Sequence, residues 1–207
     1  MPVQAASVAS VAGRPVEAAG ARPTRPVIVG IGGTLRAGSS SETALQIALD
    51  AAAGLGAETY CMTAQELALE HYAPGGAVSS VAARRLVELL RRGDGVVIST
   101  PGYHGGISGL LKNALDYTEE MAGDARAYLS DMPVGCIATA RGNQAAVTAL
   151  GNLRDVVHAL RAFPTPYGAA VISDGSDWLT DDVRRSLVLV GEQVARLAAL
   201  LKAGRNV

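Results

Sequence analysis

The residues best suited to chemistry in this chain lie in two glycine-rich loops. The first, residues 32–42, reads Gly-Gly-Thr-Leu-Arg-Ala-Gly-Ser-Ser-Ser-Glu and runs from an apolar segment into a helix start. Its glycines let backbone amides turn inward, its hydroxyls can donate, Arg36 supplies positive charge, and the dipole of the following helix favours an anion. The loop predicts a site for a terminal phosphate. Taken alone, it is equally compatible with a serine-capped helix after a glycine turn.

The second loop, residues 100–109, reads Thr-Pro-Gly-Tyr-His-Gly-Gly-Ile-Ser-Gly. Its exposed amides could bond the carbonyls and nitrogens of a planar heterocycle, while Tyr103 or His104 packs at the edge of the ring. We therefore expect this loop to support a flat ring. An ordinary strand exit is the alternative interpretation of a Pro-Gly-Tyr loop.

Spacing excludes several other common sites. A dinucleotide fingerprint that starts at Gly30 needs a glycine where Leu35 stands, and the Gly-Lys-Ser/Thr of a P-loop is absent. The Gly-x-Ser-x-Gly elbow of many hydrolases is also absent. His71 and His158 have no carboxylate or cysteine at ligand spacing, so no metal site is expected.

Alternating strands and helices must position these loops. Short β-branched apolar runs, typical of strands buried on both faces, alternate with segments of helical periodicity. This order requires right-handed crossovers in a parallel sheet, where ligands bind beyond the carboxyl ends of the strands. The site should therefore lie on the loops after the first, third and fourth strands. The expected strands are 27–32, 57–62, 95–100, 134–139 and 167–173, and the expected helices are 42–55, 81–90, 108–121, 144–160 and 181–201.

Composition narrows the function classes further. The 207 residues are 49% hydrophobic and carry a net charge of -1 with 4% aromatic residues, which argues against a nucleic-acid partner. Apolar runs fall short of the roughly 20 residues of a membrane span, so we expect a soluble protein with no membrane partner. Residues 1–26 lack periodicity and signal-peptide features, which predicts a flexible arm before one domain, residues 27–207. Cys61 and Cys136 are expected to be buried free thiols in a cytoplasmic protein.

Both loops resemble motifs of the NADPH-dependent FMN reductase family. Residues 33–41 are similar to its phosphate motif Gly-Ser-Leu-Arg-x-x-Ser-x-Asn, with Ser41 in place of the asparagine. Residues 101–117 resemble its second motif, Pro-x-Tyr-x-x-x-x-x-Gly-x-Leu-Lys-Asn-x-x-Asp-Trp/Tyr. The resemblance extends over residues 27–199. It implies a flavodoxin-like three-layer α/β/α sandwich with a five-stranded parallel sheet that holds FMN noncovalently.

The resemblance also implies which residues hold the cofactor. Arg141 and Asn143 stand where small residues are common in the family. Arg141 could attract an anionic substrate or the 2′-phosphate of NADPH. The alternative interpretation is that Arg141 is a solvated charge on the loop. The phosphate would be held by Thr34, Arg36, Ser39, Ser41 and the amide of Ser40, and the ring by Thr100, Pro101, Gly102, Tyr103, His104 and Gly105, with Thr139, Arg141 and Gly142 closing over it.

The activity implied by the resemblance is that of an NAD(P)H-dependent flavin oxidoreductase. NADPH or NADH would pass a hydride to flavin N5, and the reduced ring would pass two electrons to a second small-molecule acceptor. No protein acid or base is required, so no catalytic residue is assigned, although His104 and Tyr103 are the nearest proton donors.

An NAD(P)H:FMN reductase is the first interpretation of this activity. The alternatives are an FMN-dependent reductase or dehydrogenase of a quinone, azo compound or biosynthetic intermediate, a flavodoxin-type electron carrier, and a cofactor-free regulatory module. The resemblance further implies a homodimer or homotetramer and, for an FMN reductase, a flavin-dependent partner enzyme.

Overall fold

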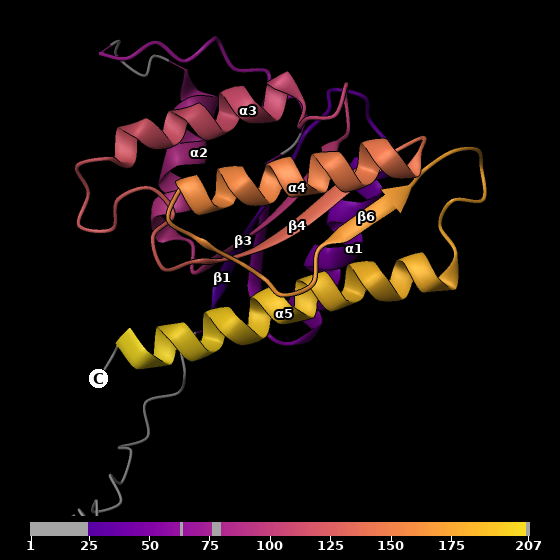
Figure 1. Ribbon diagram of the computed structural model, residues 1–207. Helices are drawn as coiled ribbons and strands as arrows, with labels where there is room; N and C mark the ends of the chain where they lie inside the picture. Colours follow the sequence, from indigo (N-terminus) through magenta and orange to yellow (C-terminus); the bar gives the residue numbers. More distant parts are fainter. Residues whose placement is uncertain (1–24, 63, 76–79, 206–207) are drawn as a thin grey trace, which may run out of the picture.

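The computed structural model describes residues 25–62, 64–75 and 80–205, and strands alternate with helices along them (Figure 1). This confirms the α/β fold class. The predicted arm, residues 1–26, lies outside the described residues except for its last two positions. The strands are β1 (Val27–Gly32), β2 (Glu58–Met62), β3 (Gly95–Pro101), β4 (Pro133–Ala140), β5 (Phe163–Pro164) and β6 (Ala169–Ile172), and the helices are α1 (Ser40–Gly54), α2 (Val81–Arg92), α3 (Gly109–Asp116), the 3-10 helix η1 (Tyr117–Met121), α4 (Asn143–Ala159) and α5 (Asp181–Arg205).

The sheet has the flavodoxin-like strand order β2-β1-β3-β4, and its far edge is formed by β5 and β6, which both pair with β4. All of these pairings are parallel. The carboxyl ends of the strands therefore meet at one edge of the sheet. The loops that follow β1, β3, β4 and β6 are gathered there.

The fifth position of the sheet differs from the prediction of one strand at 167–173. It is divided into the two-residue β5 and the four-residue β6. Pro164 and Pro166 lack the N–H that a sheet ladder uses, so this part of the chain had the pattern of a loop. The backbone still follows β4, because the Thr165 N–H donates to the Val134 carbonyl at 2.9 Å.

Serine side chains set where three helices begin. Ser39, Ser80 and Ser108 accept hydrogen bonds from backbone N–H groups in the first turns of α1, α2 and α3. Because Ser39 is the cap, α1 begins two residues before the predicted position. The predicted helix 108–121 ends its α-helical part at Asp116 and continues as η1.

Helices cover both faces of the sheet in three layers (Figure 1). One face packs on α1 and α5, with Ala48, Val97 and Val190 in its core. The other packs on α2, α3 and α4, with Leu86, Ile98 and Leu153 in its core. The two cores hold the sheet rigid, so the loops at its carboxyl edge start from fixed positions.

The two cysteines are free thiols in different surroundings. Cys136 in β4 is buried, and burial raises the pKa of its thiol to about 12. Cys61 in β2 is partly exposed, and desolvation raises the pKa of its thiol as well. The prediction of a buried thiol is thus confirmed for Cys136 and wrong for Cys61, which lies in an edge strand.

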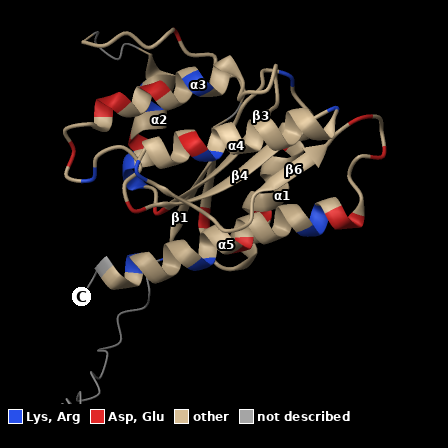
Figure 2. Ribbon diagram, in the orientation of Figure 1, with Lys and Arg blue, Asp and Glu red and all other residues tan. Residues whose placement is uncertain are grey.

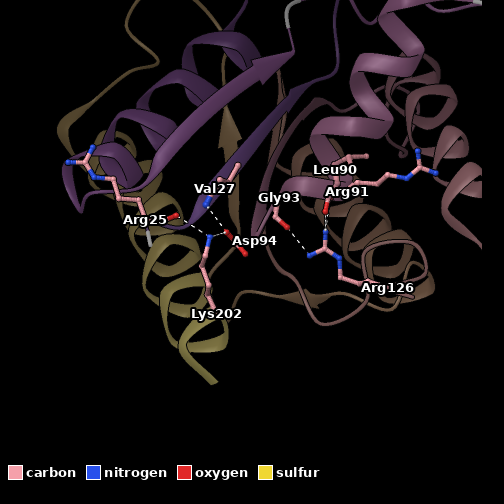
Figure 3. Close-up of polar contacts among 8 residues, drawn as sticks. All are labelled: Arg25, Val27, Leu90, Arg91, Gly93, Asp94, Arg126 and Lys202. Atoms are coloured by element: carbon pink, nitrogen blue, oxygen red, sulfur yellow. Dashed lines mark hydrogen bonds and ion pairs between the residues drawn. The ribbon is translucent and has the colours of Figure 1, made fainter. Parts of the chain in front are cut away.

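A partly buried ion pair closes the amino-terminal edge of the sheet (Figure 3). The Asp94 carboxylate, just before β3, accepts from the Val27 N–H at 2.9 Å and from Lys202 Nζ of α5 at 2.7 Å. Lys202 also donates to the Arg25 carbonyl at 3.2 Å. In the same view, the guanidinium of Arg126 donates to the carbonyls of Leu90, Arg91 and Gly93 at the end of α2.

Lys202→Met should lower the free energy of unfolding by about 2 kcal/mol, because it leaves the Asp94 carboxylate without its cation in a partly dry site. The lysine side chain is still 24% exposed, so the loss of stability should be smaller than for a fully buried ion pair. Urea unfolding measures the change. Arg196→Met on the same helix is the control, since its pair with Glu192 is exposed and its removal should change stability by less than about 0.5 kcal/mol. Equal effects of the two substitutions would contradict the prediction.

Candidate functional site

A cavity of about 650 Å³ lies among four loops at the carboxyl edge of the sheet. Each wall comes from a different strand, as expected for a ligand site in an open parallel sheet. Figure 2 shows basic positions on the loops after β1 and β4 and acidic positions on the loop after β6. The lining consists of Thr34, Arg36, Ser39, Ser40, Pro101, Gly102, Tyr103, Thr139, Ala140, Arg141, Gly142, Ala145, Ser173, Asp174 and Gly175.

The loop after β1 is shaped by its own polar groups. The Glu42 N–H donates to Ser39 Oγ at 3.2 Å, and Glu42 Oε2 accepts from the Gly38 N–H at 2.6 Å, which is a reciprocal helix cap. The Arg36 guanidinium faces the cavity and makes no ion pair with any described residue. Hydroxyls, a helix start and an uncommitted guanidinium together form the donor set that a phosphate requires.

Two glycines allow the loops to meet closely. A Cβ on Gly33 would lie 3.0 Å from the side chains of Pro101 and Ser108, so the loops after β1 and β3 are in contact there. A Cβ on Gly102 would lie 2.9 Å from the Ala145 carbonyl in the first turn of α4. The three walls are therefore locked against one another, which fixes the width of the cavity.

The loop after β3 folds into a small hairpin. Tyr103 and Gly106 exchange two backbone hydrogen bonds of 3.1 and 3.0 Å, and the two residues between them have positive φ, 51° for His104 and 82° for Gly105. These are the features of a type I′ turn. The Asn152 side chain of α4 accepts from the Ile107 N–H at 3.3 Å and holds the hairpin down. Tyr103, which is 56% exposed, consequently lines the cavity.

The loop after β4 brings the start of α4 to the cavity. The cap residue Gly142 offers no side chain to the first-turn N–H groups, unlike the serines that cap α1, α2 and α3. Arg141 beside it makes no ion pair with any described residue. This wall thus presents backbone donors and one positive charge to a ligand.

A cluster of hydroxyls joins three of the walls. Ser40 Oγ donates to Ser173 Oγ at 3.0 Å and lies 3.4 Å from Thr139 Oγ1. Ser40 is in the first turn of α1, Thr139 is in β4, and Ser173 follows β6. The loop after β6 therefore reaches the end of the cavity where α1 begins.

The structure brings most of the predicted site residues into one lining and places four outside it. Ser41 is 1% exposed and points at Ser39 Oγ, 3.3 Å away. Thr100 is buried and accepts from the Ser108 N–H at 3.1 Å. His104 and Gly105 form the tip of the hairpin. The predicted residues in the lining are Thr34, Arg36, Ser39, Ser40, Pro101, Gly102, Tyr103, Thr139, Arg141 and Gly142.

Sequence reasoning missed the fourth wall, which Ser173, Asp174 and Gly175 form. The rule that ligands bind at the carboxyl ends of parallel strands applies to the loop after the fifth strand as well, and it could have identified this segment. The two neighbours Ala140 and Ala145 were also missed. Their small side chains carry no chemical signal.

Two kinds of feature are absent from the described residues. No group of three or more His, Cys, Asp and Glu side chains there is arranged to hold a metal ion. Within the same residues, every helix is too short or too polar to cross a membrane.

Comparison with known proteins identifies the family of this chain. The model of the NADPH-dependent FMN reductase family matches residues 26–177. An NADPH azoreductase of Bacillus sp. (strain OY1-2) is 33% identical over 94 residues, which are 45% of this chain. The chain spans about half the length of that relative, 48%.

Two further proteins are similar over a longer stretch. An NAD(P)H-dependent FMN reductase of Pseudomonas aeruginosa is 28% identical over 169 residues, 78% of this chain and 88% of that protein. The solved structure of an NAD(P)H:(acceptor) oxidoreductase from Paracoccus denitrificans superposes with a TM-score of 0.64 at 19% identity, covering 86% of this chain and 98% of that one. This last likeness supports the fold.

Proposed function

Because the chain belongs to the NADPH-dependent FMN reductase family, we propose that it is an NAD(P)H-dependent oxidoreductase that binds FMN in this cavity, and specifically an NAD(P)H:FMN reductase. The observation that carries the proposal is that one cavity holds both Arg36, which makes no ion pair with any described residue, and the exposed Tyr103. Arg36 lies beside the serine-rich start of α1. Arg36 suits a terminal phosphate and Tyr103 suits a flat ring.

The residues would divide the work between binding and orientation. Arg36, Thr34 and the hydroxyls of Ser39 and Ser40 would hold the phosphate, while the Tyr103 hairpin would fix the plane of the ring. When bound, FMN would supply the two-electron redox chemistry. The exposed side of the hairpin leaves room for a nicotinamide or a second substrate.

An FMN-retaining reductase of a small acceptor is the second candidate. The similarity to an azoreductase favours it, as does a cavity whose third wall carries the positive charge of Arg141. A quinone, an azo compound or a biosynthetic intermediate would then accept the electrons. Tight retention of FMN during turnover distinguishes this candidate from a reductase that releases reduced flavin.

An absorbance spectrum followed by anaerobic titration tests the proposal. The purified protein should take up FMN, and NADPH or NADH should bleach the flavin band at about 450 nm. Protein that fails to take up FMN would overturn both candidates. Slow release of FMN on dilution would favour the second candidate over the first.

Arg141→Ala should raise the Michaelis constant for NADPH about tenfold and that for NADH less than twofold, because only NADPH carries a 2′-phosphate that the guanidinium can bond. Steady-state rates with both nucleotides measure the difference. Arg85→Ala on α2 is the control, since Arg85 pairs with Glu66 away from the cavity. Equal effects on the two nucleotides would retire the role in nucleotide selection.

The assembly and setting of the protein are part of the proposal. We propose a cytoplasmic homodimer or homotetramer, and a flavin-dependent partner enzyme that receives reduced flavin if the first candidate holds. The interface between subunits would include the exposed face of α4, where Val147 is 52% exposed. Light scattering of the purified protein measures the oligomeric state.

A further inference from the structure

The hydroxyl cluster between Ser40, Thr139 and Ser173 gives the loop after β6 a role that the proposed function does not yet use. Ser40 has one hydroxyl proton, and here it points to Ser173 Oγ at 3.0 Å, with Thr139 Oγ1 at 3.4 Å. All three residues line the cavity. Ser40 is thus the junction between the phosphate loop and the two neighbouring strands.

The sheet holds Ser173 firmly in this place. Its N–H donates to the Ala140 carbonyl at 2.7 Å, directly after the parallel pairing of β6 with β4. Val171, two residues earlier, is buried in the core under α1 and α5. Gly175, with φ 77°, follows two residues after Ser173 and also lines the cavity. The Ser173 hydroxyl is therefore supplied by a rigid element and not by a free loop.

A phosphate dianion accepts hydrogen bonds and donates none. Its binding would therefore reverse the donor and acceptor in the hydrogen bond between Ser40 and Ser173. Ser40 can donate to a phosphate oxygen only if its O–H rotates away from Ser173 Oγ. The Ser173 hydroxyl is then free to rotate and donate to Ser40 Oγ. Donors arranged in such a chain polarise one another, which strengthens the final bond to the anion.

We propose that Ser173 is a positioning residue for the flavin phosphate, which orients and polarises the Ser40 hydroxyl toward it and so favours phosphorylated over unphosphorylated flavin. This inference rests on the FMN site proposed above. Ser173 acts through Ser40 and does not itself touch the ligand.

Parallel titrations with FMN and riboflavin test the inference, because riboflavin has the same ring and ribityl chain without the phosphate. Ser173→Ala should weaken FMN binding about three- to tenfold and change riboflavin binding less than twofold. Ser173→Thr keeps the hydroxyl and should stay within about twofold of the wild type for both ligands. Ser176→Ala, which alters an exposed hydroxyl of the same loop, is the matched control.

A double-mutant cycle separates action through Ser40 from direct contact. In a Ser40→Ala background, Ser173→Ala should add less than about twofold to the loss of FMN affinity. A full additional loss, an equal loss for riboflavin, or unchanged FMN binding in Ser173→Ala would each overturn the inference. If the wild-type protein bound neither flavin, the proposed FMN site itself would be wrong. Thermal unfolding of each variant confirms that the fold is retained.

Discussion

Replacing Gly191 with alanine will lower the free energy of unfolding by about 3 kcal/mol or more. Gly191 lies in α5 where that helix crosses α1, and a Cβ there would sit 1.9 Å from the Ala48 carbonyl oxygen. A backbone atom cannot rotate away as a side chain can, so the two helices must separate. The separation would also loosen α5 from β4, where Val190 packs directly over Gly135.

The sign of this change is the opposite of what helix propensity predicts. An alanine normally stabilises a helix interior over glycine by about 0.5–1 kcal/mol. Gly204→Ala in the same helix is the control, because a Cβ there meets no atom within 4 Å, and it should leave stability unchanged or slightly raised. Urea unfolding of both variants gives the comparison. A Gly191→Ala protein as stable as the wild type would show that α1 and α5 are not held at this spacing.

Arg36→Ala should weaken FMN binding by about 1.5–3 kcal/mol, which is roughly 10- to 150-fold in the dissociation constant. The guanidinium lies in the cavity lining without an ion pair in the described chain, so its charge is available to a phosphate. Its loss removes a charge-assisted hydrogen bond from a dianion. Fluorescence titration of the protein with FMN measures the affinity.

Riboflavin supplies the internal control for this substitution. Because riboflavin lacks the phosphate, its affinity should change less than about twofold in the same variant. Arg85→Ala tests whether any loss of positive charge has the same effect, and we expect none. Unchanged FMN affinity in Arg36→Ala would indicate that the phosphate binds at another wall of the cavity.

Local patterns in the sequence were enough to predict the fold class and most of the residues that line the candidate cavity. Strands buried on both faces, such as Val27–Gly32, have continuous apolar runs because helices cover the sheet on both sides. The serine that caps α1 and the glycines around it are neighbours along the chain, so their arrangement can be predicted from the local sequence. The boundaries moved by a few residues, since Ser39 and Ser108 decide where the helices start.

Contacts between distant parts of the chain could not be predicted in the same way. The hairpin at Tyr103, in which His104 has a positive φ, is held by Asn152. The Asn152 side chain accepts from the N–H of Ile107, which lies 45 residues earlier in the chain. Cys61 was expected to be buried, yet it is partly exposed because β2 is an edge strand. The position of β2 at the edge of the sheet follows from topology alone. Periodicity shows that a strand exists but not which strands flank it.

The sequence by itself determined the alternation of strands and helices, the glycine- and serine-rich loop after the first strand and the family to which the chain belongs, because each of these depends on short, contiguous patterns. Only the tertiary structure decided that Ser173, 133 residues away from Ser40, completes the cavity. That contact exists because β6 pairs with β4 in one register, which carries the following loop to the start of α1. Register and strand order are properties of the whole sheet, and no local pattern encodes them.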